Sequence, residues 1–204
     1  MPRPKKKPAN RYHHGDLRQA LLDVAVRTIQ QEGVEHLTLR SAGAELGVSR
    51  TALYRHFTDK QALLAAVSRE GFRMLREATH EAWDRRGRGR GGFEAMGHAY
   101  FRFAVTHPSH YRVMFGSFVD ACSRDEALIE EASGAFQVLV DALVELQRTG
   151  LARKDDPALL ARFVWSVVHG VAMLAIDGQL GETPADAETL SAYAIERLRS
   201  AVAA

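Results

Sequence analysis

The residues best suited to chemistry lie together in the stretch GVSRTALYRHFTDK, residues 47–60. Two arginines, a lysine, a tyrosine and a histidine surround only two large aliphatic or phenyl side chains, Leu53 and Phe57. Arginine can hold guanine through two hydrogen bonds, threonine offers a hydroxyl and a methyl group, and tyrosine and histidine can donate to phosphate oxygens. These residue types favour nucleic-acid recognition, although an isolated helix could carry them as an ordinary solvated face.

Residues 38–57 are predicted to form two short helices joined by a tight turn. Thr38 is expected to cap the first helix, Gly47 to end it in the left-handed conformation, and Ser49 to cap the second. Gly43 costs about 1 kcal/mol relative to alanine inside a helix, so we expect a neighbouring helix to approach its backbone closely. This pattern is typical of a helix-turn-helix, whose second helix lies in the major groove of DNA.

The second of these helices is predicted to have two unlike faces. Leu53 and Phe57 are four residues apart and share the inward face. The outward face and its flanks hold Arg50, Thr51, Ala52, Tyr54, Arg55 and His56. Such a face can contact both base edges and phosphates.

Charge is distributed unevenly along the chain. Residues 1–60 hold 11 lysines and arginines against six acidic residues, a net charge of +5, whereas the whole chain has +2, which leaves −3 for the remainder. A basic first third beside a mildly acidic body indicates a nucleic-acid-facing module joined to a second part. Charge alone would also be explained by a solubilising tail.

Helical periodicity covers almost the whole chain, and no alternating strand pattern occurs, which predicts an all-α fold of about nine helices. Asp16 is predicted to cap the first helix, over residues 17–32, and a long amphipathic helix is predicted from residue 59 to 83. The glycine-rich, charged segment 84–92 is predicted to be a flexible loop. Further helices are expected at residues 93–106, 108–116, 124–149, 156–178 and 185–202.

The segment LTLRSAGAELGVSRTALYRHFTDKQALLAAV resembles the centre of the DNA-binding domain of the TetR family of bacterial transcription regulators, a resemblance that covers residues 15–75. In GVS…LYRHF…K…LL the turn, cap, aromatic residue and lysine all stand at the family spacing. The chain departs from the family at Ala42 and Gly43, where a larger aliphatic residue followed by alanine is usual. The resemblance implies that residues 76–204 form a helical body that binds a small molecule and forms a homodimer through its last two long helices.

Carried over to this sequence, the resemblance implies two kinds of contact with double-stranded DNA. The residues that face base edges would be Arg40, Arg50, Thr51, Ala52 and Arg55. The residues that hold phosphates would be Thr38, Ser49, Tyr54, His56 and Lys60. We therefore expect a repressor that acts as a homodimer on a pseudo-palindromic operator and that a ligand releases, with recognition helices about 34 Å apart.

Residues 1–14 are expected to form a flexible basic tail. The tail could add phosphate contacts, each of which would steepen the dependence of log affinity on log salt by about 0.9. It could equally be a solubilising leader.

The helix predicted at 156–178 carries Trp165, His169 and Met173 on one apolar stripe, and its Trp-x-x-x-His-Gly pattern resembles that of one branch of TetR regulators. The stripe could be core or dimer seam, or it could line a cavity for a largely apolar effector. Buried, His169 would need a hydrogen-bond partner. Further candidate cavity walls are Met114, Phe118 and Phe136.

Other chemistries find less support. His107 and His110 could suggest a metal pair, but no third ligand stands at a suitable spacing, and we expect neither metal nor cofactor. The single cysteine, Cys122, excludes an intramolecular disulfide. The longest apolar run, residues 163–176, is shorter than a membrane span, and no apolar segment follows the basic N-terminus, so we expect a cytoplasmic protein.

Two other classes of function stay open. An all-α enzyme could use a cavity around His169, but no nucleophile, carboxylate pair or phosphate loop accompanies it. A protein-interaction module could use the helix-turn-helix, which the +5 charge argues against. Neither accounts for Arg50, Tyr54, His56 and Lys60 together, and we expect a regulator rather than an enzyme.

Overall fold

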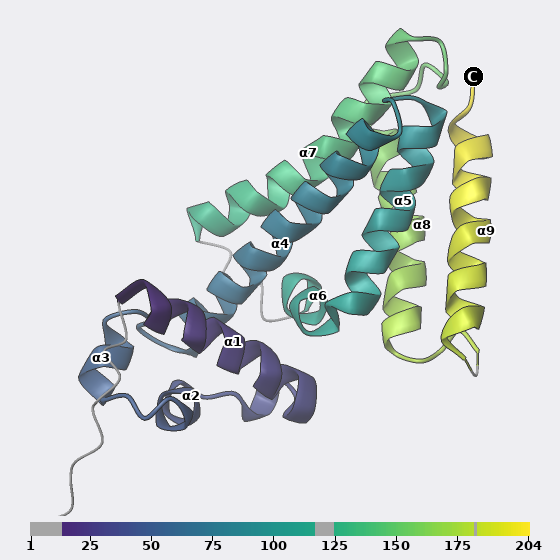
Figure 1. The fold of residues 1–204 in the computed structure, drawn as a ribbon. Coiled ribbons are helices and arrows are strands. Elements are labelled where there is room, and N and C mark those ends of the chain that lie inside the picture. The colour runs from purple at the N-terminus through teal and green to yellow at the C-terminus, as the bar shows by residue number, and fades with distance from the viewer. Residues whose placement is uncertain (1–13, 117–124, 182) are drawn as a thin grey trace, which may run out of the picture. The chain divides into compact units, whose positions relative to one another are not determined.

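The computed structural model describes residues 14–116, 125–181 and 183–204, and these residues form nine α-helices and one 3-10 helix without a strand (Figure 1). The all-α fold predicted from the helical periodicity is confirmed. The elements are α1 (His14–Glu32), η1 (Val34–His36), α2 (Leu39–Glu45), α3 (Arg50–Tyr54), α4 (Lys60–Arg85), α5 (Arg90–Thr106), α6 (Pro108–Phe115), α7 (Glu126–Arg148), α8 (Pro157–Ile176) and α9 (Pro184–Val202).

Internal contacts divide the chain into two compact units, Met1–Leu63 and Leu64–Ala204. Helix α4 begins in the first unit and continues into the second. The division after Leu63 reflects where contacts between residues are few. The domain limits expected from the sequence, at residues 14 and 75, stay predictions.

The first unit is organised around one face of α1. Leu21, Val24 and Ala25 recur at helical spacing and are completely or almost completely buried, so that side of the helix forms the centre of the unit. Gly33, with φ of 94°, takes the chain out of α1 and into η1. The short helices α2 and α3 follow.

The start of α1 differs from the prediction. The helix begins at His14, so Asp16 lies inside its first turn, and the prediction that Asp16 caps the helix was wrong. The helix dipole favours an aspartate in the first turn as well as at the cap, and the residue type therefore does not fix where a helix begins. Residues 1–13, which hold most of the predicted tail, lie outside the described part of the chain.

In the second unit, α8 lies against α5, α7 and α9, and α5 also contacts α9 (Figure 1). Buried side chains form two clusters. One surrounds Tyr111 and Met114, and the other surrounds Trp83 and Leu143. Helix α6 closes on α4 at Gly71, where a Cβ atom would collide with the side chain of Met114.

The segment between α4 and α5 is shorter than predicted. Helix α4 runs to Arg85 and α5 begins at Arg90, so the prediction of a loop over residues 84–92 was wrong for most of its length. Gly92 lies in α5 against Trp83, and a Cβ there would stand 2.8 Å from the ring carbon Cε3 and 2.9 Å from the carbonyl oxygen. This glycine therefore serves close helix packing rather than loop flexibility.

Helix α8 alone among the described helices is long and apolar enough, by length and composition, to cross a membrane. The helix predicted over residues 156–178 is confirmed as α8, and it meets this criterion by mean hydropathy although Arg162 and His169 interrupt its run of apolar residues. The core helix of a soluble protein meets the same criterion, and α8 packs against three other helices. Its remaining surface carries the exposed side chains Leu159, Phe163 and Leu174.

Candidate nucleic-acid interface and ligand cavity

The predicted helix caps of the helix-turn-helix are confirmed. Thr38 Oγ1 accepts a hydrogen bond of 2.9 Å from the backbone N–H of Ser41, and Ser49 Oγ accepts one of 3.3 Å from the N–H of Ala52. Gly47, with φ of 65°, lies in the left-handed region and ends α2 as predicted. Local sequence thus fixes the angle at which α3 leaves α2.

Two side chains dock α3 on the rest of the first unit. Leu53 and Phe57 are 3% and 4% exposed, which confirms the predicted inward face, although Phe57 lies just beyond the end of α3. A Cβ at Gly43 would lie 3.0 Å from Leu53 Cδ2, so the close approach expected at this glycine is confirmed. The Arg18 guanidinium covers the Phe57 ring at 5.4 Å from its centroid.

The opposite face of α3 is polar and open to solvent. Tyr54 is 54% exposed although it is a large aromatic residue. The other predicted contact residues that are exposed are Thr38, Arg40, Ser49, Arg50, Thr51 and Arg55, whereas Ala52, His56 and Lys60 are half-buried. The helix therefore brings arginine, threonine and tyrosine side chains to one surface from which they can reach a nucleic acid.

Lys60 has a structural role that the sequence did not indicate. Its ammonium group donates to the backbone carbonyl oxygens of Val34, at 2.7 Å, and Glu35, at 3.3 Å, and so joins the start of α4 to η1. The same positive charge lies on a half-buried side chain, and its predicted phosphate contact stays a prediction.

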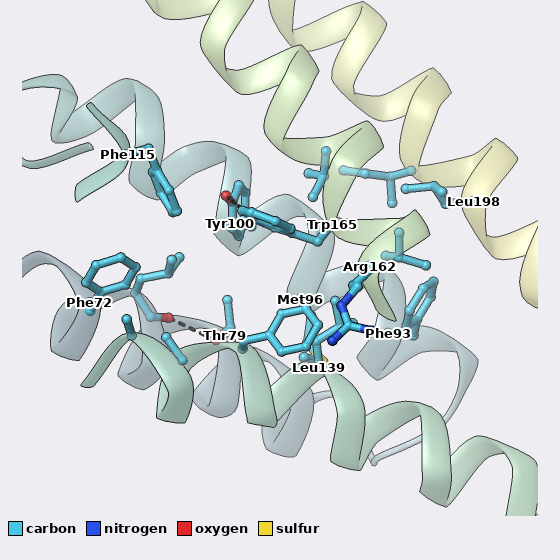
Figure 2. A pocket seen from close by; sticks show the side chains of 18 residues that line it. Phe72, Thr79, Phe93, Met96, Tyr100, Phe115, Leu139, Arg162, Trp165 and Leu198 are labelled. Carbon is cyan, nitrogen blue, oxygen red and sulfur yellow. Dashed lines mark hydrogen bonds between the residues drawn. The ribbon is translucent and has the colours of Figure 1, made fainter. Parts of the chain in front are cut away.

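The second unit contains a cavity of about 380 Å³, within the range of about 300–1,000 Å³ usual for ligand sites (Figure 2). Helices α4 to α9 all contribute to its wall. The lining residues are Phe72, Leu75, Thr79, Phe93, Met96, Gly97, Tyr100, Phe115, Ala132, Ala135, Phe136, Leu139, Arg162, Val164, Trp165, Val168, Ile195 and Leu198.

The candidate ligand residues named from the sequence occupy different positions around this cavity. Phe136 and Trp165 line it, whereas Met114 is buried in the core and Met173 packs against the same core cluster. Phe118 and Cys122 lie outside the described residues. Arg162 lines the cavity and was missed, although its place three residues before Trp165 on one helix face was a usable signal.

Four side chains form a hydrogen-bonded cluster at the cavity, and two of them, Tyr100 and Trp165, line it. Trp165 Nε1 donates to the Tyr100 hydroxyl at 3.0 Å, the Tyr100 and Tyr111 hydroxyls are 2.8 Å apart, and the Tyr111 hydroxyl is 2.7 Å from His169 Nδ1. The predicted need of His169 for a partner is thereby confirmed. His169 itself is absent from the lining and contacts Trp165 ring to ring.

Burial sets the protonation of this cluster. Burial lowers the pKa of His169 below its usual value and raises the pKa of Tyr100 to about 12. Burial raises the pKa of Tyr111 as well, and more strongly. Both tyrosines therefore keep their protons at neutral pH, and a neutral His169 accepts from Tyr111 through Nδ1. The cluster orients rings instead of supplying a nucleophile.

His107, just before α6, and His110, within it, have hydrogen-bond partners outside the tyrosine cluster. His110 Nε2 lies 3.3 Å from a carboxylate oxygen of Glu70, and His107 Nδ1 lies 2.9 Å from the Thr106 hydroxyl. Over the described ranges, no three histidine, cysteine, aspartate or glutamate side chains are grouped as metal ligands.

A capped helix-turn-helix with an exposed polar second helix, joined in one chain to an all-α unit with an apolar cavity, defines a ligand-responsive class of transcription regulator. Residues 21–67 match the family described as bacterial regulatory proteins, tetR family, and residues 93–198 match the Tetracyclin repressor-like C-terminal domain. The chain belongs to the TetR family and is a DNA-binding transcription regulator.

Individual relatives agree with this assignment. The chain is 23% identical over 165 residues to YobS of Bacillus subtilis, an uncharacterised HTH-type transcriptional regulator, covering 78% of this chain and 79% of the relative. It is 38% identical over 60 residues to the nicotine-responsive repressor HdnoR of Paenarthrobacter nicotinovorans, over 29% and 31% of the two chains. A solved structure of a protein of unknown function from Rhodococcus sp. RHA1 is 31% identical, with a TM-score of 0.84, and the match covers 96% of this chain and 100% of that one.

Proposed function

We propose that this regulator is a repressor that a small, largely apolar effector releases from its operator. The observation that carries the proposal is the apolar cavity of about 380 Å³ in the same chain as the exposed polar face of α3. The family description of the second unit as repressor-like and the nicotine response of HdnoR support it by analogy.

On the DNA, we assign base edges to the exposed side chains Arg50, Thr51 and Arg55, together with Arg40 and Ala52. Arginine in the major groove can bind guanine through two hydrogen bonds. Phosphates are assigned to Ser49 and Tyr54 beside them, with Thr38, His56 and Lys60 at the edge of the same surface. The roles rest on exposure and on the family pattern.

A homodimer is the form proposed to bind a pseudo-palindromic operator. Support comes from a strip of exposed large apolar side chains on the last two helices, which contact each other along their length: Leu159, Phe163 and Leu174 on α8, Leu190 and Tyr193 on α9. Pairing of this strip with a second copy would remove it from water. A cytoplasmic location and the lack of a catalysed reaction would both suit a protein that binds an operator.

Release follows from a difference in affinity between two conformations. The effector would bind the cavity more tightly when the two α3 helices of the dimer are not spaced one DNA turn, about 34 Å, apart. A conformational shift of the second units would then break contacts between one α3 helix and its major groove, and the affinity for the operator would fall.

The DNA surface is tested by fluorescence anisotropy on promoter DNA adjoining the chain's own gene. We expect Arg50→Ala and Tyr54→Ala each to weaken binding by about tenfold or more, because each removes a charged or phosphate-directed hydrogen bond. Arg153→Ala, an exposed arginine of the second unit, is the matched control and should bind as the unaltered protein does. Unchanged affinity in both α3 variants would refute the assignment of this face.

A further inference from the structure

The proposed function leaves the chemistry of the effector open, and the wall of the cavity narrows it. We propose that the effector is an amphipathic monocarboxylate whose carboxylate binds Arg162 and whose apolar chain fills the cavity. The inference rests on the proposed function, in which this cavity is the effector site.

Among the described residues that line the cavity, Arg162 is the one with a charged side chain. Figure 2 shows its side chain reaching from α8 towards Phe93 and Leu139, so the guanidinium stands over an apolar surface. Within the described part of the chain, none of the ion pairs involves Arg162. A guanidinium stays protonated in proteins, and the cavity therefore has an unneutralised positive charge at its wall.

The other polar groups of the wall are already engaged within the protein. The Thr79 hydroxyl donates to the Leu75 carbonyl oxygen at 2.9 Å. Trp165 Nε1 donates to Tyr100, and the Tyr100 hydroxyl is hydrogen-bonded to Tyr111. The donors left for a ligand are thus those of Arg162.

This inventory selects the polar end of the ligand. A guanidinium has donors and no acceptor, and a carboxylate matches its planar fork with two parallel charge-assisted hydrogen bonds. A cationic ligand would be repelled by Arg162.

The remainder of the wall selects the body of the ligand. From Arg162 the cavity passes Met96 and the Trp165 ring to Phe72 and Phe115 at its far end (Figure 2). These side chains favour an alkyl or similar apolar chain, which gains affinity as its surface leaves water. Because Arg162 itself is exposed, the carboxylate can keep part of its hydration, so it avoids the full desolvation cost of a buried ion.

Isothermal titration calorimetry of the full chain with decanoate, decanol and decylamine tests the inference. All three probes have the same chain, and only the head group differs. We expect decanoate to bind about tenfold to a hundredfold more tightly than decanol, as a hydrogen-bonded charge pair implies. Decylamine should bind more weakly than decanol.

Three variants locate the effect. Arg162→Gln should remove the preference for decanoate and leave decanol affinity unchanged, and Arg162→Lys should retain part of the preference because it keeps the charge but loses the fork. Arg153→Gln, an exposed arginine of the same unit outside the cavity wall, should keep the full preference. Circular dichroism confirms that each variant folds.

The outcomes separate this inference from the proposed function. Equal affinity for decanoate and decanol, a preference that survives Arg162→Gln, or no binding of any probe would each overturn the carboxylate inference. Anisotropy with promoter DNA is measured in parallel. If decanol binds as well as decanoate and also releases the DNA, an apolar effector remains and only the head group is wrong.

Discussion

At the scale of single residues, His169 shows how hydrogen bonds and ring contacts hold a half-buried polar side chain. Its Nδ1 lies 2.7 Å from the Tyr111 hydroxyl and 3.1 Å from that of Tyr100, and the Trp165 ring packs against it. Each tyrosine has a single O–H, so the three groups are all satisfied when Tyr100 donates to Tyr111 and Tyr111 donates to a neutral imidazole. Protonation of His169 would place two donors against each other.

Stability should therefore depend on pH through His169. Burial lowers its pKa in the folded chain, whereas the unfolded value is near 6.5. Below that value the unfolded chain binds a proton that the folded chain resists, so the free energy of unfolding falls as the pH drops from about 6.5 towards the lowered folded pKa, and is unaffected by this group above 6.5. Urea unfolding at about pH 7.5 and about pH 5 should show this loss, and His169→Gln should reduce it.

The matched control for this prediction is His98→Gln, which removes a partly exposed histidine of α5 outside the cluster. It should leave the loss of stability at low pH as it is in the unaltered chain. An identical loss in His169→Gln would mean that other titrating groups cause it. His169→Gln is also expected to be less stable than the unaltered chain at pH 7.5, since a glutamine amide does not reproduce the contact of the imidazole with Tyr111.

At the scale of elements, two adjacent glycines of α5 separate helix propensity from packing. A Cβ at Gly92 would meet the ring and carbonyl oxygen of Trp83 at 2.8 and 2.9 Å, whereas a Cβ at Gly91 would lie an ordinary 3.7 Å from the Arg86 carbonyl oxygen. Both residues are helical, so alanine is compatible with the backbone at either position.

Gly92→Ala should destabilise the protein by about 1–3 kcal/mol, because the carbonyl of Trp83 belongs to a helix and cannot move aside without shifting it. Gly91→Ala is the internal control and should be neutral or stabilising by up to about 1 kcal/mol, since alanine is the better helix former. Thermal and urea unfolding of both variants measures the difference. Equal effects in the two would contradict the packing role of Gly92.

The same pair of glycines explains where prediction from sequence succeeds and where it stops. Hydrophobic period reports which face of a segment is buried, and it identified α4, α5 and α8 as helices. It cannot distinguish a glycine that loosens a loop from one that admits a neighbouring helix, so the segment around Gly92 was misassigned. Asp16 shows a related limit, because a residue that suits the N-cap of a helix also suits its first turn.

The helix-turn-helix and the cavity also differ in how far the sequence alone predicts them. The helix-turn-helix is encoded locally: Thr38, Gly47 and Ser49 act on their own neighbours, and their geometry followed from spacing alone. The cavity is assembled from six helices, and its wall depends on which rotamers face inward in the folded unit. Tyr100 became visible as a wall residue only with the fold, and Arg162 was indicated in the sequence only by its spacing from Trp165.

At the scale of the whole molecule, α8 and α9 carry five of the nine large apolar side chains that are exposed among the described residues. Leu159, Phe163 and Tyr193 are 64%, 49% and 58% exposed, and all lie on α8 or α9. The same strip explains why most of the apolar helix α8 is not buried within one chain. A second copy of the strip would cover these residues.

Phe163→Glu should therefore convert the proposed dimer to a monomer. The substitution places a charge in the centre of an apolar contact, where an unpaired carboxylate loses its hydration, so we expect the dissociation constant of the dimer to rise by at least about a hundredfold. Sedimentation equilibrium measures it, and Val144→Glu, which changes an equally exposed apolar residue on α7, should stay dimeric. Operator affinity should fall together with dimerisation, because one protomer alone contacts one half-site and loses the effective concentration of the second. A Phe163→Glu protein that remains a dimer would place the interface elsewhere on the second unit.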